Sequence, residues 1–322
     1  MKKKQISIES RIDAIMAKID FVVEDIKAIK IQWATNIARA WFRVLREEIL
    51  DTDFVDKKEF LLFLNKAIDH LIHARSTEPM LQNGMKYALW TYHKLEKESL
   101  SVIIQGVDDA LQELLDLIYS GDLLRAKIWS DLIKSGSRIM THCHSWSVVK
   151  LLSQAWQEGK KFQVVNTEAR PLYQWRITSQ ELVDEWIPTI LITDDMWSYY
   201  LDQTVQDTPK VDMLLLGCDA IKPNGNIINK VGSFALALSA WHSWIPVYIV
   251  GSLMKYDAED IINIELRDGA EIRPMAPKDL NILNFAFDTV PAKFISGIVT
   301  RDAVIDPQNL NKIVQKKYPW IV

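Results

Sequence analysis

The chain has 322 residues, 48% hydrophobic and 25% charged, so it is long enough to bury a sizeable core without covalent staples. Its formal net charge of only −4 gives no reason to expect a nucleic acid or an anionic membrane as partner. Two cysteines argue against a disulfide framework, and no run approaches the roughly 18 apolar residues of a membrane span. No apolar secretory core follows the basic start, so we expect a cytoplasmic protein.

The first third of the chain has helical periodicity. Apolar residues recur every three or four positions from Ile8 to Ile29, which predicts one apolar helical stripe. Further helices are predicted over residues 34–51 and 57–74 and, as one helix or two, over residues 101–133, and Pro79 is expected in a turn or at a first helical position. We therefore expect residues 1–130 to form a helical N-terminal domain.

After about residue 135 the pattern changes to short apolar runs that alternate with helical patterns. The runs are RIMTH, KFQVVNT, PTILIT, VDMLLLGCDA and IPVYIVGS, and one intervening helix is expected to begin at TSQEL. Near-continuous apolar strands separated by helices are typical of a parallel sheet that is covered on both faces. One more strand and a last helix are expected from FAFDTVP onward. Residues 131–322 are thus predicted to form a Rossmann-like α/β domain.

Open parallel sheets bind ligands beyond the carboxyl ends of their strands. Polar and reactive residues follow four of the predicted strands, which predicts a site at that edge of the sheet. These residues are Cys143, His144, Glu168, Arg170, Cys218, Asp219, Ser252 and Lys255.

Cys143 stands between two histidines in the stretch GSRIMTHCHSWSVVKLL. In an extended segment neighbouring side chains point to opposite faces, and no further ligand spacing is present, which disfavours a metal site. Two interpretations remain open. Cys143 is either a small buried residue or a reactive thiol just before a helix N-terminus, where amides and the helix dipole favour a thiolate.

Asp219 follows four apolar strand residues and is either a cap or a half-buried catalytic carboxylate. The turn KPNGN leads to Asn229, Lys230 and Gly232 at the expected start of a helix, an arrangement that suits an anion. The chain has neither a Walker loop nor a G-x-G-x-x-G motif, so binding of a nicotinamide or flavin cofactor has little support.

Four stretches together carry a resemblance to a known family: IMTHCHS, NTEARPLYQ with RITSQEL, GCDAIKPNGNIINKVGSFALALSA, and FAFDTVP. The chain resembles the ribose-1,5-bisphosphate isomerases, the methylthioribose-1-phosphate isomerases and the α, β and δ subunits of translation initiation factor 2B. The resemblance covers most of the chain from about residue 31. The enzymes of this family are distinguished by a cysteine and an aspartate, which match Cys143 and Asp219. The ARST segment and the THCHS form are most similar to ribose-1,5-bisphosphate isomerase.

The resemblance implies an aldose–ketose isomerase that needs neither a metal nor an organic cofactor. It implies Cys143 as thiolate base and Asp219 as acid. It also implies binding of a sugar-phosphate substrate, a nucleotide monophosphate as candidate effector, and a homodimer or homohexamer. Substrate contacts are expected at Arg75, Ser145, Trp146, Ser147, Asn229, Lys230 and Lys255.

Several residues depart from the family pattern. Gln32 and Trp33 replace an Arg-Gly pair, and Trp146 stands where a small or basic residue is common. These residues motivate an alternative from another class, a non-catalytic subunit that senses a nucleotide or sugar phosphate.

Overall fold

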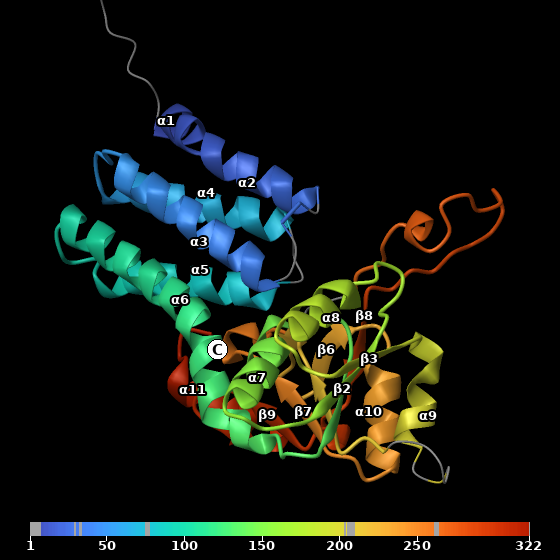
Figure 1. Ribbon diagram of the computed structural model, residues 1–322. Helices are drawn as coiled ribbons and strands as arrows, with labels where there is room; N and C mark the ends of the chain where they lie inside the picture. The colour runs from blue at the N-terminus through green and yellow to red at the C-terminus, as the bar shows by residue number, and fades with distance from the viewer. Residues whose placement is uncertain are drawn as a thin grey trace, which may run out of the picture. The chain divides into compact units, whose positions relative to one another are not determined.

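The computed structural model describes residues 8–28, 30–31, 34–74, 78–202, 204, 210–260 and 264–321. The chain divides into two compact units (Figure 1). Residues 1–119 with 318–322 form the first, here called the helical unit, and residues 120–317 form the second, the α/β unit. Within the described ranges, no helix has the length and apolar character that crossing a lipid bilayer requires.

The helical unit packs amphipathic helices around a shared apolar core. Its helices are α1 (Ile8–Ile15), α2 (Ala17–Lys27), α3 (Ala34–Asp51), α4 (Lys57–Ala74), α5 (Pro79–Lys94) and the first part of α6 (Leu100–Trp129). α3 and α4 have the predicted bounds, and Pro79 is the first residue of α5, where its missing N–H costs nothing.

The predicted stripe from residue 8 onward is divided between two helices, because the helix is interrupted at Met16. Ile12, Ile19 and Ile26 are all buried, so the apolar period continues across the interruption. Ile29 lies outside the described residues. A periodicity that is preserved on both sides of a break cannot reveal the break.

The α/β unit is built on a seven-stranded sheet in the order β10-β9-β7-β4-β1-β2-β3. All pairs are parallel except β9 with the edge strand β10. The strands are β1 (Arg138–Thr141), β2 (Gln163–Thr167), β3 (Thr189–Ile192), β4 (Met213–Leu216), β7 (Val247–Val250), β9 (Gly297–Val299) and β10 (Val304–Ile305). The first five occupy the predicted apolar runs, which confirms the predicted fold class.

The helices that follow β1 in the chain are α7 (Trp146–Gln157), α8 (Trp175–Asp184), α9 (Trp197–Leu201), α10 (Ser233–His242) and α11 (Leu310–Lys317). Helices α7 to α10 lie in the crossovers between parallel strands of this sheet, whereas α11 follows its last strand. The crossovers through α7 and α8 lead from β1 toward β3, whereas the one through α10 leads the opposite way, from β4 to β7. Right-handed crossovers therefore place α10 on the other face from α7 and α8.

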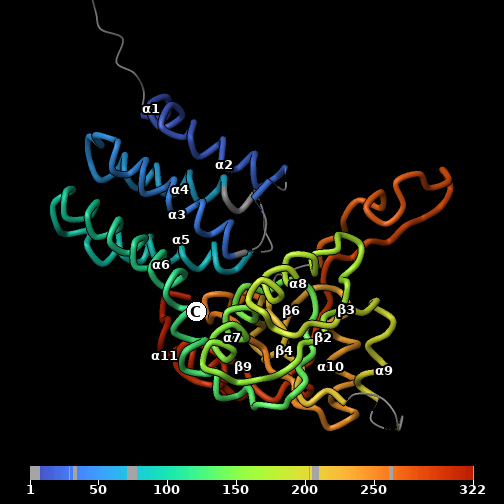
Figure 2. The backbone as a smooth tube through the Cα atoms, viewed as in Figure 1, coloured from blue at the N-terminus to red at the C-terminus, as the bar shows by residue number. Residues whose placement is uncertain are grey.

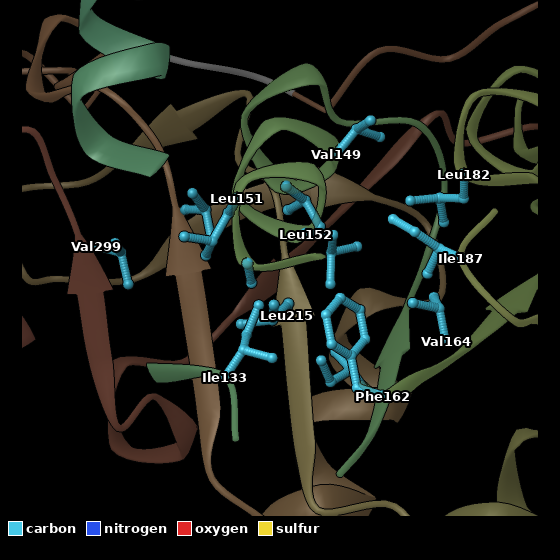
Figure 3. Packing of buried hydrophobic residues seen from close by; sticks show 14 residues of the cluster. Ile133, Val149, Leu151, Leu152, Phe162, Val164, Leu182, Ile187, Leu215 and Val299 are labelled. Atoms are coloured by element: carbon cyan, nitrogen blue, oxygen red, sulfur yellow. The ribbon is translucent and has the colours of Figure 1, made fainter. Parts of the chain in front are cut away.

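The core beneath α7 fixes the position of this helix on the sheet. Leu151 and Leu152 of α7 pack with Leu215 of β4 and Val299 of β9, all fully buried (Figure 3). Closely packed branched side chains resist small displacements. The N-terminus of α7, which begins three residues after Cys143, is consequently held at the carboxyl edge of the strands.

A second sheet of three antiparallel strands, β5-β6-β8, was not predicted. Its strands are β5 (Ala220–Ile221), β6 (Ile227–Lys230) and β8 (Phe287–Val290). The prediction that Asn229 and Lys230 begin a helix is therefore wrong: both lie on β6, and α10 begins at Ser233. The C-terminal part likewise contains three strands, β8 to β10, instead of one. Pairing of β6 with β8 joins residues about 60 positions apart, which no local pattern reveals.

α8 also begins earlier than predicted, at Trp175 and not at TSQEL. Thr178 is fully buried inside the helix, and its hydroxyl donates to the carbonyl of Cys143 at 3.1 Å. A threonine used for a tertiary contact cannot be distinguished by sequence from a helix cap.

Between β7 and β8 the chain makes a long excursion away from the body of the α/β unit (Figure 2). Its base is closed by a bridge between Leu266 and Phe285. Met275 is 90% exposed on this excursion.

Candidate functional site

Cys143 and Asp219 follow the two strands between which the chain order of the sheet reverses. β1 leads toward β2 and β3 on one side, and its other neighbour is β4. Cys143 comes just after β1, and Asp219 just after β4. In open α/β sheets the crevice at this reversal is the usual ligand site.

Cys143 is buried, with 7% of its surface exposed, and has a left-handed backbone with φ 64°. Its thiol donates a hydrogen bond to Oε1 of Gln174 at 3.2 Å. Burial raises the pKa of the thiol to about 11, Lys230 opposes this rise, and the negative charges of Asp219 and Asp194 add to it. The resting group is therefore a neutral thiol, in contrast to the thiolate expected at a helix N-terminus.

Asp219 is half-buried, and its position is set through the backbone. Its N–H donates to the carbonyl of Ile228 on β6 at 2.8 Å. The carbonyl of the preceding Cys218 accepts from the ammonium of Lys255 at 2.5 Å. No described residue donates a hydrogen bond to the Asp219 carboxylate, and no described helix begins there. The arrangement leaves this carboxylate available to a ligand.

Lys230 and Asn229 are both buried on β6, 7% and 6% exposed. The amide of Asn229 donates to Oγ of Ser233 at 2.8 Å, and Ser233 donates to the carbonyl of Lys230 at 2.7 Å. The Lys230 ammonium lies 5.2 Å from the ring centroid of Phe287. No described carboxylate forms an ion pair with Lys230, so its charge acts on the pKa of Cys143 without a competing partner.

The N-terminus of α10 is not free to bind an anion, contrary to the prediction from the KPNGN turn. Asp288 of β8 accepts from the N–H groups of Gly232 at 2.8 Å and Phe234 at 3.2 Å. Burial raises the pKa of Asp288 to about 6, although these two hydrogen bonds oppose the rise. The protein's own carboxylate thus occupies the place where an anion was expected.

The N-terminus of α7 is different. Ser145 is its N-cap residue, but its side chain makes no capping hydrogen bond. Ser145 instead packs closely on Gly217, where an added Cβ would lie 2.6 Å from the serine Oγ. Trp146 is 38% exposed, and its ring lies 4.2 Å from the ammonium of Lys150. The side chains of this turn leave the helix N-terminus without a carboxylate cap.

Ser147 is held by an ion pair on α6 that was not predicted from the sequence. Its hydroxyl donates to Asp122 at 2.6 Å and accepts from Arg125 at 3.3 Å. Asp122 and Arg125 form an ion pair near the end of α6 and are 8% and 3% exposed. Charged residues three positions apart on a helix are usually exposed to solvent, so the sequence predicts a surface ion pair. Only the packing of α6 against α7 shows that Asp122 and Arg125 are buried and contact Ser147.

The remaining predicted positions either contact the neighbouring backbone, point to other partners at the surface, or lie outside the described residues. Lys255 contacts the strand end at Cys218, whereas Ser252 accepts from the N–H of Met254. Arg170 is exposed and is directed to the carbonyl of Ile272 and the ring of Tyr173. Arg75, Gln32 and Trp33 lie outside the described residues.

Gln174 was missed, although it ends the stretch NTEARPLYQ that carries the resemblance. Its carbonyl oxygen is the acceptor of the Cys143 thiol. Asp194 was also missed; it accepts from the N–H groups of Ala169 and Arg170 at 2.8 Å and so fixes the loop before Gln174.

The side chains of the two histidines beside Cys143 have different hydrogen-bond partners. His142 contacts Thr167 and Val231, whereas His144 contacts Thr178. Among the residues that the structure describes, no three His, Cys, Asp or Glu side chains gather in a way that could hold a metal ion.

Residues 30–307 match the model of the initiation factor 2 subunit family. Over 315 residues the chain is 31% identical to the ribose 1,5-bisphosphate isomerase of Methanocaldococcus jannaschii, covering 95% of this chain and 98% of that protein. It is also 31% identical to the methylthioribose-1-phosphate isomerase of Pelotomaculum thermopropionicum, covering 91% of this chain and 85% of that protein.

Two solved structures from Pyrococcus horikoshii OT3 have the same fold. Translation initiation factor eIF-2B has a TM-score of 0.76 at 20% identity, covering 90% of this chain and 98% of that one. 5-Methylthioribose 1-phosphate isomerase has a TM-score of 0.73 at 24% identity, covering 92% and 86%. At these identities the likeness concerns the fold.

Proposed function

This chain belongs to the initiation factor 2 subunit family and is one of its isomerases, and we propose that it converts ribose 1,5-bisphosphate into ribulose 1,5-bisphosphate. The observation that supports the proposal best is the position of Cys143 and Asp219. They lie after the two strands that flank the reversal of the sheet, with Lys230 close enough to affect the thiol. The ribose 1,5-bisphosphate isomerases also match almost the full length of the chain.

The reaction opens the sugar ring and then moves a proton from C2 to C1. In the proposed mechanism, Asp219 in its acid form protonates the ring oxygen as the bond between C1 and that oxygen breaks. Cys143, as thiolate, takes the proton from C2 and returns it to C1. The hydroxyl on C2 gives its proton to the Asp219 carboxylate as it becomes the ketone. Each group thus ends in the form in which it began.

The raised pKa of Cys143 sets a condition on this mechanism, because the resting pair is a thiol and a carboxylate. The thiol proton must first pass to the Asp219 carboxylate, which gives the thiolate and the acid with which the reaction begins. Lys230 favours the thiolate, and so does the positive charge that ring opening creates at C1. The left-handed backbone at Cys143 is the kind of local strain that occurs at functional sites. A placed acid and a placed base each contribute about 10²–10⁴-fold to such a reaction.

The phosphates would bind to cations and to amide donors around this pair. We assign one phosphate to Lys230 and to the first turn of α7, where Ser145, Trp146 and Ser147 lie. The hydroxyls would contact Asn229 and Gln174. Lys255 would hold the Cys218 carbonyl and use its other N–H groups for the substrate, and Arg75 stays a predicted phosphate contact.

The test is a coupled assay of the full-length protein with ribose 1,5-bisphosphate and, separately, methylthioribose 1-phosphate. We expect turnover of the first and a loss of at least 10²-fold in kcat for Cys143→Ser and for Asp219→Asn. The exposed Glu259→Gln, on the same unit, is the matched control for the loss of one carboxylate. Turnover of methylthioribose 1-phosphate alone would contradict the proposed substrate. Unchanged turnover by Cys143→Ser would contradict the assignment of Cys143 as the base.

We also infer that the chain associates with copies of itself through the α/β unit. Phe234, Leu238 and Trp241 lie at helical spacing on α10 and are 39%, 38% and 50% exposed. An apolar stripe of this kind, on a helix that also packs against its own sheet, is suited to a second copy of the same surface.

A further inference from the structure

His142 is a buried histidine that the proposed mechanism does not use. It is 4% exposed and directly precedes Cys143. Its Nε2 lies 2.8 Å from the carbonyl oxygen of Val231, and its Nδ1 lies 2.5 Å from Oγ1 of Thr167. Both ring nitrogens are thus engaged.

These partners determine where the ring proton lies. A carbonyl oxygen can only accept, so Nε2 carries the hydrogen and donates it to Val231. Nδ1 then has a lone pair and accepts from the hydroxyl of Thr167. Burial lowers the pKa of His142, which agrees with a neutral ring. A protonated ring would lose the hydrogen bond from Thr167.

The hydrogen bond to Val231 joins two segments that carry chemistry. His142 precedes Cys143 at the end of the seven-stranded sheet, whereas Val231 follows Lys230 at the end of β6 in the three-stranded sheet. Gly232 permits the close approach, because an added Cβ would lie 3.1 Å from Nε2 of His142. The imidazole therefore connects the backbone of Cys143 to that of Lys230.

We propose that His142 is a positioning residue: its neutral imidazole, anchored by Thr167, holds the Lys230 segment beside Cys143, so that one cation serves both the thiol and the substrate phosphate. The part that concerns the substrate rests on the proposed function. The part that concerns the thiol does not, since the charged groups that act on Cys143 are Lys230, Asp219 and Asp194, and only Lys230 favours the thiolate.

The experiment measures how fast iodoacetamide alkylates Cys143 in the full-length protein, at a fixed pH of about 9, by mass spectrometry of the Cys143 peptide. Only the thiolate reacts, so a rise of one unit in the thiol pKa slows the reaction about tenfold. We expect His142→Ala to slow alkylation by about the same factor as Lys230→Met. We expect His142→Gln, whose amide can donate to Val231 and accept from Thr167, to restore most of the rate.

His144→Ala is the matched control, because His144 also adjoins Cys143 but contacts Thr178. His144→Ala should leave the alkylation rate within about twofold of wild type, because the expected slowing comes from displacement of Lys230, whose segment His142 holds. A merely structural role for His142 would give the opposite sign, since a loosened site exposes the thiol and accelerates alkylation. Faster or unchanged alkylation in a folded His142→Ala variant overturns the proposal.

Two further measurements keep the outcome decisive. If His142→Ala does not fold, Thr167→Val removes only the donor to Nδ1 and should slow alkylation in the same direction; an unchanged rate overturns the proposal. If the wild-type protein does not turn over ribose 1,5-bisphosphate, the proposed function fails, whereas the alkylation rates still decide the role of His142. If it does, His142→Ala should lower kcat, and His142→Gln should recover it.

Discussion

At the scale of single residues, the site is defined by one thiol whose charge state depends on its neighbours. Cys143 is buried, donates to Gln174 and has a left-handed backbone. Burial is the largest influence on its pKa, and the opposing charges of Lys230 and Asp219 are smaller. Because burial outweighs the charge of Lys230, the resting group is a neutral thiol, and a neutral thiol resists oxidation and alkylation.

This balance leads to a prediction about Asp219. The carboxylate raises the pKa of Cys143, so Asp219→Asn should lower that pKa and accelerate alkylation of the thiol at pH 9 several-fold. In the wild-type protein the rate should rise about tenfold per pH unit toward a pKa of about 11. The measurement is the iodoacetamide rate at the Cys143 peptide. A slower rate in Asp219→Asn would show that the carboxylate does not act on the thiol by its charge.

At the scale of elements, the two helix N-termini near the site have different roles. α10 is capped by Asp288 from the neighbouring strand β8, whereas the N-cap residue of α7, Ser145, makes no side-chain cap. A cap with a buried carboxylate holds α10 against the second sheet. It also leaves α7 as the helix whose N-terminus can serve a ligand.

The Asp288 cap should make stability depend on pH. Its pKa is about 6 when folded, above the ordinary 3.8, so the folded protein binds more protons between these values. Stability should therefore fall as pH rises from about 4 to 6, and Asp288→Asn should remove this component. The measurement is the difference in unfolding free energy between wild type and variant, from urea titrations across pH 3.5 to 7. A difference that stays constant over this range would contradict the assignment.

At the scale of the whole molecule, each unit has its own helices and core, and exposed apolar residues gather on α10. Phe234, Leu238 and Trp241 form its exposed stripe. In addition, Trp244 is 93% exposed just beyond the end of the helix. So much exposed apolar surface is costly for a chain that stays single in water.

Self-association through this stripe is testable by mass in solution. Leu238→Glu places a charge in the centre of the stripe and should convert the oligomer to monomers in size-exclusion chromatography with light scattering. Val102→Glu on α6 makes the same chemical change at a residue that is 45% exposed on the helical unit, and should leave the mass unchanged. A wild-type protein that is monomeric, or a Leu238→Glu oligomer of unchanged mass, would contradict the proposed interface.

The sequence by itself determined several helices of the first third, five strands of the large sheet, and the edge of that sheet at which Cys143 and Asp219 lie. Apolar periodicity is local, so α3, α4 and five parallel strands could be predicted within a few residues. Only the tertiary structure decided that Asn229 and Lys230 lie on a strand, that Asp288 closes α10, and that Gln174 meets the thiol. Asp288 and Gly232 are 56 residues apart, and Cys143 and Gln174 are 31 apart. Contacts at such separations depend on how helices and strands pack against one another, and a local sequence pattern carries no information about that packing.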